Sequence, residues 1–159
     1  MRLRTSHSIP ILMLGAVLVA GCAGTPSSPP LNFGDMSANN LRYQAETRRE
    51  AGDLDQAMIY VDKLIELHSA EARKMQASLS DYPPANDAYG YGTLNGVGVA
   101  YLIKAEMLMK KGDKAGAREA YSTLSRDFYY AQHQDGKYNW YKTGEVAMQR
   151  LEKLKADPR

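Results

Sequence analysis

The sequence predicts an all-α fold of about five helices packed as antiparallel pairs, preceded by a signal peptide and a flexible linker. Three observations predict this fold. Apolar residues recur at three- and four-residue steps along most of the chain, which is the spacing of one helix face. The pairs Gly52-Asp53 and Gly112-Asp113 separate such segments, and a glycine often ends a helix. The segments around the two pairs also match each other, which indicates a repeated helix pair.

The chain begins with the layout of a secretory signal peptide. Arg2 and Arg4, with no acidic residue, precede an apolar run of 12 residues at 9–20, and small residues follow. As a helix this run would span about 18 Å, which is too short for a bilayer core of about 30 Å. Residues 1–21 are therefore expected to be a signal peptide rather than a permanent transmembrane helix.

The only cysteine of the chain follows this run directly. The segment LVAGC at 18–22 resembles the lipobox of bacterial lipoproteins, in which the cysteine receives a diacylglyceryl group and becomes the first mature residue. The resemblance implies that Cys22 is the lipidation site. Ala23 stands where an aspartate would retain such a protein at the inner membrane, which implies the outer membrane, with the domain on its periplasmic face. The alternative is an ordinary signal peptide cut nearby, with Cys22 incidental.

Removal of the signal peptide leaves a neutral chain. Without Arg2 and Arg4, 18 of the 20 Lys and Arg residues remain against 18 Asp and Glu residues. No run of five or more basic residues occurs, so nucleic-acid binding is not expected. Because an internal disulfide needs two cysteines, packing alone must hold the domain together.

A linker and two helices are expected next. Residues 22–37 carry the lipidated cysteine and are rich in Pro, Ser and Gly, which predicts a flexible linker before a helical domain at 38–159. The first helix is expected to end at Gly52. Asp53 suits the N-cap of a second helix, which keeps helical spacing from 54 to about 80 and would span roughly 40 Å. The alternative is a break near His68.

Three further helices are expected after a turn-rich segment at 81–96. A connection of this length without its own structure is often functional. The helix at 97–111 is apolar nearly all round, which places it in the middle of the fold. Two more helices are expected at 114–130 and 138–155, the last with Trp140 facing inward.

The repeat carries a second resemblance. Positions that match between its copies include Gly52 with Gly112, Asp53 with Asp113, Ala57 with Ala117 and Leu64 with Leu124, and upstream Ala45 with Ala105 and Leu41 with Tyr101. This pattern resembles the tetratricopeptide repeat (TPR), which implies TPR-like stacked helix pairs over about 41–68 and 101–128. The copies lie 60 residues apart instead of the 34 of that family, so a regular superhelix is not expected. An unrelated five-helix bundle is the alternative.

No sequence pattern indicates catalysis or metal binding. After the signal peptide the chain has two histidines, His68 and His133, without HExxH, paired cysteines, a calcium loop or GxSxG. No metal and no cofactor are expected, and His68 is expected to be a packing residue. Glu106 stands alone among apolar residues and could be an acid with a raised pKa. A pair with Lys110, or a polar stripe with Lys104, is the plainer interpretation, so the chain is not expected to be an enzyme.

Tyrosine dominates the aromatic residues, with 11 Tyr against two Phe and one Trp. Stacked helix pairs leave a concave face, and aromatic side chains there serve as contact anchors. Aromatic rings also stack on sugar rings. The repeat places Tyr101 and Tyr121 in the core. The predicted partner-binding residues are Tyr89, Tyr91, Tyr129 and Tyr130.

These features predict a membrane-anchored periplasmic TPR-like lipoprotein. It is expected to act as a protein–protein interaction scaffold in the assembly of a cell-envelope or secretion complex. The expected partners are an envelope protein and the membrane, the latter through the lipid on Cys22. The alternative is a cell-wall or exopolysaccharide-binding module, with peptidoglycan or polysaccharide as its ligand. An enzyme acting on glycans is a third hypothesis, which depends on Glu106.

Overall fold

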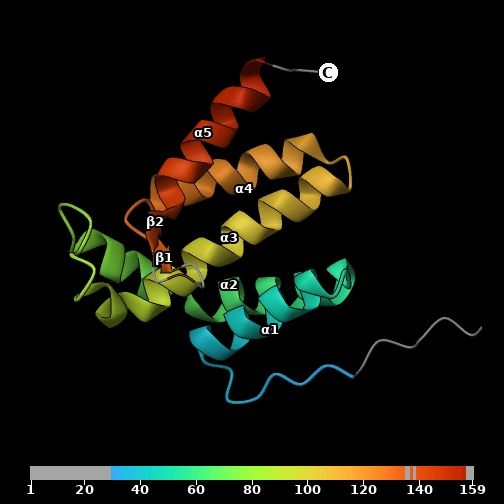
Figure 1. Ribbon diagram of the computed structural model, residues 1–159, viewed down its shortest axis with the longest axis horizontal. Coiled ribbons are helices and arrows are strands. Elements are labelled where there is room, and N and C mark those ends of the chain that lie inside the picture. The colour runs from blue at the N-terminus through green and yellow to red at the C-terminus, as the bar shows by residue number, and fades with distance from the viewer. Residues whose placement is uncertain (1–29, 135–136, 138, 157–159) are drawn as a thin grey trace, which may run out of the picture.

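The computed structural model describes residues 30–134, 137 and 139–156, and it confirms the all-α prediction (Figure 1). Within these residues there are five α-helices, one 3-10 helix and one two-stranded antiparallel sheet. Their bounds are α1 (Ala38–Glu50), α2 (Leu54–Ala77), η1 (Ala88–Tyr91), α3 (Gly92–Lys110), α4 (Lys114–Asp127), β1 (Gln132–Gln134), β2 (Trp140–Lys142) and α5 (Thr143–Ala156). The predicted signal peptide and Cys22, the predicted lipidation site, lie outside the described residues.

Consecutive helices pack against each other as antiparallel neighbours, and α3 lies in the middle. Figure 1 shows α3 between the α1–α2 pair and the α4–α5 pair. Helix α3 also packs against α1 and α5, so these three form one layer, while α2 and α4 lie on the other side. The central position fits the apolar sequence of α3, whose Leu94, Ile103 and Met107 are fully buried.

The two Gly-Asp pairs form the same helix corner. Gly52 has a φ of +81°, a left-handed conformation that glycine adopts without steric cost. The Asp53 N–H donates to the carbonyl of Arg48 at 2.9 Å, and the Asp53 carboxylate then accepts from the N–H of Gln56 at 3.2 Å. The first bond satisfies the end of α1 and the second caps α2. The corner at Gly112 has the same φ and the same 2.9 Å closing bond, so both predicted corners are confirmed.

The long second helix is also confirmed. Helix α2 runs without a break from Leu54 to Ala77, so the alternative of a break near His68 is wrong. His68 is half-buried, and its Nε2 lies 2.8 Å from the carbonyl oxygen of Met36. This histidine therefore fixes the chain before α1 onto α2, which agrees with a packing role.

Helix α3 begins five residues earlier than predicted, at Gly92, and η1 precedes it. The sequence here is rich in glycine, which favours turns, but Gly96 and Gly98 lie inside the helix at points where neighbouring elements come very close. A Cβ on Gly96 would stand 3.3 Å from the Cβ of Ala38 on α1. A Cβ on Gly98 would overlap the Cβ of Ala131. These glycines therefore permit close packing rather than a turn.

The last helix begins later than predicted, at Thr143 rather than near residue 138. Trp140 lies in β2, which pairs antiparallel with β1, with His133 opposite Tyr141. The Thr143 N–H and hydroxyl both donate to the carbonyl of Ala131, at 3.0 and 2.9 Å. These bonds hold the two ends of a β-hairpin together, and local pairing there replaces the predicted first turn of helix.

Packing extends on the N-terminal side into the segment expected as linker. The Asn32 N–H donates to the Tyr60 hydroxyl at 2.8 Å, and this hydroxyl donates to the Asn32 carbonyl at 3.0 Å. The ring of Phe33 lies 5.3 Å from that of Tyr60, and Asn40 Nδ2 donates to the Phe33 carbonyl at 2.6 Å. The packed unit therefore reaches back at least to Asn32.

Candidate functional site

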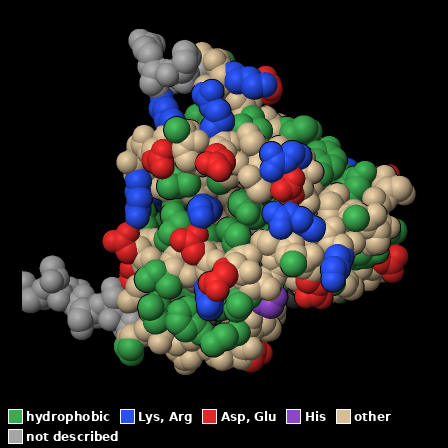
Figure 2. Space-filling model, turned by 180° about the vertical axis from the view of Figure 1, so that it is seen from behind, with side chains coloured by type: hydrophobic (Ala, Val, Ile, Leu, Met, Phe, Trp, Pro, Cys, Tyr) green, Lys and Arg blue, Asp and Glu red, His purple; other side chains and the backbone are tan. Residues whose placement is uncertain are grey.

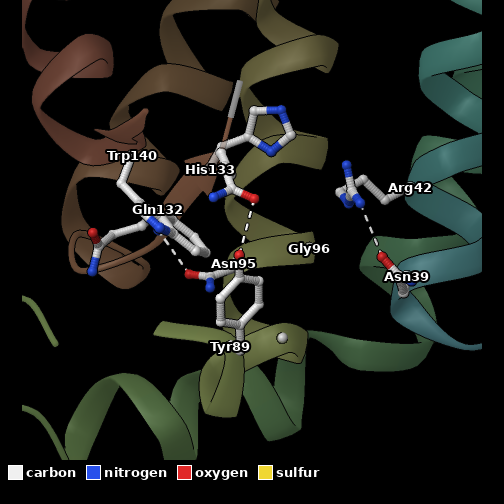
Figure 3. Close-up of a pocket in the computed structure, with 10 residues that line it drawn as sticks. Asn39, Arg42, Tyr89, Asn95, Gly96, Gln132, His133 and Trp140 are labelled. Atoms are coloured by element: carbon white, nitrogen blue, oxygen red, sulfur yellow. Dashed lines mark hydrogen bonds between the residues drawn. The ribbon is translucent and has the colours of Figure 1, made fainter. Parts of the chain in front are cut away.

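A cavity of about 500 Å³, here called the hairpin pocket, lies between α1, the start of α3 and the β-hairpin (Figure 3). Its volume is typical of small-ligand pockets, which measure roughly 300–1,000 Å³. The described residues that line it are Asn39 and Arg42 from α1, Tyr89 from η1, Gly92, Asn95 and Gly96 from α3, and Gln132, His133, Gln134 and Trp140 from the hairpin. None of these side chains is aliphatic. The pocket therefore presents carboxamides and aromatic rings.

Two aromatic rings meet at one side of the pocket. Tyr89 is 65% exposed, and its ring lies 5.1 Å from that of Trp140 at an interplanar angle of 78°. The Tyr89 hydroxyl donates to Gln134 Oε1 at 3.1 Å. This bond joins η1 to the hairpin, so the exposed tyrosine is held by an aromatic contact and a hydrogen bond.

The carboxamides behind these rings are also held in place. Asn95 Oδ1 accepts from the Gln132 N–H at 2.7 Å, while Asn95 Nδ2 donates to the Ala88 carbonyl at 2.8 Å. Gln132 is buried, and its Nε2 donates to the carbonyl of Pro83 at 2.8 Å. Each amide thus has a fixed orientation before any ligand arrives, which is what a preformed binding site requires.

Helix α1 contributes a charge-balanced edge. The Arg42 guanidinium donates to Glu46 at 2.7 Å and to Asn39 Oδ1 at 2.9 Å. His133 Nε2 lies 3.4 Å from the other oxygen of Glu46. Burial raises the pKa of the Glu46 carboxyl, and Arg42 opposes this rise. Burial also raises the pKa of Tyr141 to about 12, with Glu46 adding to the effect.

Tyr129 and Tyr130 lie in a separate cluster with Tyr82. The Tyr82 ring lies 5.5 Å from the ring of Tyr129 and 5.2 Å from the ring of Tyr130. The Lys142 ammonium lies 4.2 Å from the centre of the Tyr82 ring. The Tyr130 hydroxyl donates to the Ser80 carbonyl at 2.9 Å. Burial raises the pKa of Tyr82, and Tyr129 adds to the rise. This cluster attaches the chain after α2 to the end of α4.

The structure therefore divides the four predicted partner-binding tyrosines. Tyr89 lines the hairpin pocket, whereas Tyr129 and Tyr130 are half-buried in the cluster around Tyr82. Tyr91 is half-buried against the core and lines none of the cavities described here. Of the four, Tyr89 has the geometry of an accessible contact residue.

A second cavity, here called the basic groove, lies between α3, α4 and α5 and measures about 540 Å³. Its floor is apolar and includes Met109, Tyr121 and Leu154. Its cationic lining residues are Lys110, Lys114, Arg150 and Lys153. Among the described residues, none of these four has an acidic partner within 4.0 Å.

Glu106 is the one acidic residue that lines the basic groove. Its carboxylate pairs with the Arg49 guanidinium of α1 at 3.2 Å, and both side chains are about one-third exposed. The ion pair expected with Lys110 is therefore not the observed one, and Lys104 pairs with Asp62 instead. Glu106 lies near Tyr121, whose pKa is raised first by burial and then by Glu106, while Arg150 opposes the rise. Because Arg49 neutralises Glu106, the groove keeps an excess of positive charge.

The charge pattern elsewhere is mixed. Figure 2 shows a face on which Lys and Arg side chains lie next to Asp and Glu side chains, with hydrophobic side chains between them. Ion pairs across elements include Lys104 with Asp62 and Lys111 with Asp55, both at 2.7 Å. The concentration of cations in the basic groove is therefore a local feature.

Sequence reasoning missed Trp140, Gln132 and Gln134 as site residues, since Trp140 was expected to face inward from a helix. The signal that could have found them is the Asp-Gly pair at 135–136, which separates two segments rich in aromatic and polar residues. An Asp-Gly pair between such segments is typical of a β-hairpin.

Neither a metal centre nor a membrane span is found in the part of the chain that the structure describes. There, no three His, Cys, Asp or Glu side chains lie together as metal ligands would. No helix within the described residues is both long enough and apolar enough to cross a bilayer.

Comparisons with known proteins add no family. No family model matches the sequence, and no curated protein or solved structure matches it significantly. The lipobox and the TPR-like pattern therefore remain resemblances.

Proposed function

We propose that this chain is a lipid-anchored, TPR-like scaffold on the periplasmic face of the outer membrane. It holds a protein partner during the assembly of a cell-envelope or secretion complex. The lipobox resemblance at Cys22 supports the anchor, and the stacked helix pairs supply the binding surface. The mechanism is tethering and recognition, without a chemical reaction.

The basic groove is the observation that carries this proposal. An apolar floor with a cationic rim suits a partner segment that combines acidic and apolar side chains. Lys110, Arg150 and Lys153 are exposed at the rim, where each charge pair contributes about 0.2–1 kcal/mol. The floor, with Tyr121 and Leu154, gives apolar area to bury. The attraction should weaken as salt rises, because rim charges are screened.

The packed N-terminal segment limits how far the domain can move from its anchor. Asn32, which is bonded to Tyr60, lies ten positions after Cys22 in the sequence. A fully extended chain covers at most about 3.6 Å per residue, so Asn32 stays within roughly 36 Å of the lipidated cysteine. The scaffold therefore works close to the membrane surface.

Capture from envelope extracts tests the proposal with a matched pair of variants. We expect wild type to retain a defined protein partner and Lys110→Gln/Arg150→Gln to bind it about 2- to 30-fold more weakly, from two rim charges of 0.2–1 kcal/mol each. Lys74→Gln changes an exposed lysine of α2 outside the groove and should bind like wild type. Equal binding by all three proteins, or no partner at all, would contradict the scaffold proposal.

A second candidate function is a cell-wall or exopolysaccharide-binding module. The hairpin pocket favours it, because Tyr89 and Trp140 stand beside fixed carboxamides. The two functions use different surfaces, so one molecule can serve both.

A further inference from the structure

The lining of the hairpin pocket matches the chemistry of a sugar. A sugar ring carries hydroxyls that both donate and accept hydrogen bonds, and its C–H faces are apolar. Carboxamides offer a donor and an acceptor on the same side chain. The pocket brings together four of them, from Asn39, Asn95, Gln132 and Gln134, with the rings of Tyr89 and Trp140.

The aromatic pair is accessible as well as fixed. Tyr89 is mostly exposed, yet its hydroxyl is bonded to Gln134 and its ring contacts Trp140 edge to face. Figure 3 shows the labelled Tyr89 and Trp140 side chains beside Asn95 and Gln132. Little side-chain freedom is then lost when a ligand stacks there, which favours binding.

The charge balance points to a neutral ligand. Arg42 is the one Lys or Arg side chain among the described lining residues, and Glu46 neutralises it at 2.7 Å. No Asp or Glu is among those lining residues. A strongly anionic or cationic ligand would therefore gain little net attraction in the hairpin pocket. The basic groove differs, because its excess positive charge would attract an acidic segment.

The lining also disfavours a peptide. Peptide grooves normally give apolar pockets to alternate side chains or offer an open strand edge. The described lining of the hairpin pocket has no aliphatic side chain, so it offers no apolar pocket to peptide side chains. A peptide is thus the competing ligand class, and the experiment must distinguish peptide binding from sugar binding.

We propose that the hairpin pocket binds a neutral oligosaccharide, with a sugar ring stacked on Tyr89 or Trp140 and its hydroxyls bonded to the surrounding carboxamides. This deepens the second candidate function, and it assigns the site to residues from η1, α3, α1 and the hairpin. No bond is made or broken, so the site recognises the sugar without hydrolysing it.

Trp140 provides the assay, because it is the only tryptophan in the chain. The full chain, purified in detergent, is titrated with two neutral linear probes, an N-acetylglucosamine tetrasaccharide and a β-1,4-linked glucose tetrasaccharide. At least one is expected to change the Trp140 emission in a saturable way. A neutral hexapeptide serves as the competing probe. No change with either sugar, or a saturable change with the hexapeptide alone, overturns the proposal.

Two variants with matched controls locate the binding. Gly92 lines the pocket, and a Cβ there meets no atom within 4 Å, so Gly92→Leu projects into open space and should weaken sugar binding at least tenfold. A Cβ on Gly90 also meets nothing within 4 Å, but Gly90 does not line the pocket, so Gly90→Leu should bind like wild type. Tyr89→Ala should abolish sugar binding. Tyr43→Ala removes an exposed tyrosine of α1 that does not line the pocket, and this variant should bind the sugar like wild type.

Equal affinities for Gly92→Leu and Gly90→Leu would place the sugar outside the pocket and overturn the assignment. The titration uses no protein partner, so its failure leaves the scaffold proposal untouched. Failed partner capture likewise leaves the sugar site in place.

Discussion

Replacing Gly112 by alanine changes one helix corner without touching a neighbouring side chain. Gly112 has a φ of +81°, and a Cβ built on it meets no atom within 4 Å. The cost is therefore conformational, because the left-handed region costs an ordinary L-residue roughly 1–2 kcal/mol. We expect Gly112→Ala to lower the free energy of unfolding by about 1–2 kcal/mol. Gly52→Ala should cost the same, since its corner has the same φ and closing bond.

Urea unfolding of the full chain, followed by circular dichroism at 222 nm, measures these changes. Gly92→Ala is the matched control because a Cβ there is equally free, while φ is −52° and suits any residue. That substitution should stabilise the fold by about 0.4–1 kcal/mol, through a smaller conformational entropy of the unfolded chain. If Gly112→Ala and Gly92→Ala change stability by the same amount, the corner does not depend on a left-handed glycine and this reasoning is refuted.

Three further predictions concern packing, titration and the anchor. Gly98→Ala should destabilise the fold by about 1–3 kcal/mol in the same urea assay, because its methyl would overlap Ala131; unchanged stability would contradict the close packing of α3 on the hairpin. Burial raises the pKa of Glu46 above 4.5, so its native form binds a proton more tightly than its unfolded form and stability is lost as pH rises above that value. The stability of wild type minus that of Glu46→Gln should therefore fall between pH 4 and pH 7, and a difference that grows with pH would contradict the shift. Cys22→Ser should abolish palmitate labelling and release the protein from membranes, whereas membrane retention like that of wild type would count against the lipid anchor.

The helix corners and the long α2 could be predicted from the sequence because their signals are local. Gly52 and Gly112 end helices through their own backbone conformation, and Asp53 caps the next helix three residues on. The apolar stripe of α2 persists over its whole length, and no Gly or Pro interrupts it before residue 83. Local signals of this kind require no knowledge of what lies opposite in space.

The start of α3 and the hairpin could not be predicted in this way, because distant contacts decide them. Gly96 and Gly98 lie in a helix, where they leave room for Ala38 and Ala131 from other elements, and no local signal shows these neighbours. Arg49, the ion-pair partner of Glu106, is 57 residues away in the sequence.

The candidate sites were predicted only in part for the same reason. Tyr89 was proposed as a contact residue, but its neighbours Trp140 and Gln134 lie about 50 residues away in the sequence, in a hairpin that was not predicted and whose second strand was expected to be helix. The basic groove combines lysines and an arginine from three helices, and no run of five or more basic residues marks it in the sequence.

Site-specific photocrosslinking in cells that make the full chain tests the central claim most directly, namely that the basic groove holds a partner at the membrane. A photoreactive residue would replace Lys153 in the groove or, in a separate variant, Lys74 on α2 outside it. The scaffold proposal predicts one defined protein adduct from position 153 in the membrane fraction, and no such adduct from position 74. Identical adducts from both positions, or an adduct from position 74 alone, would contradict it.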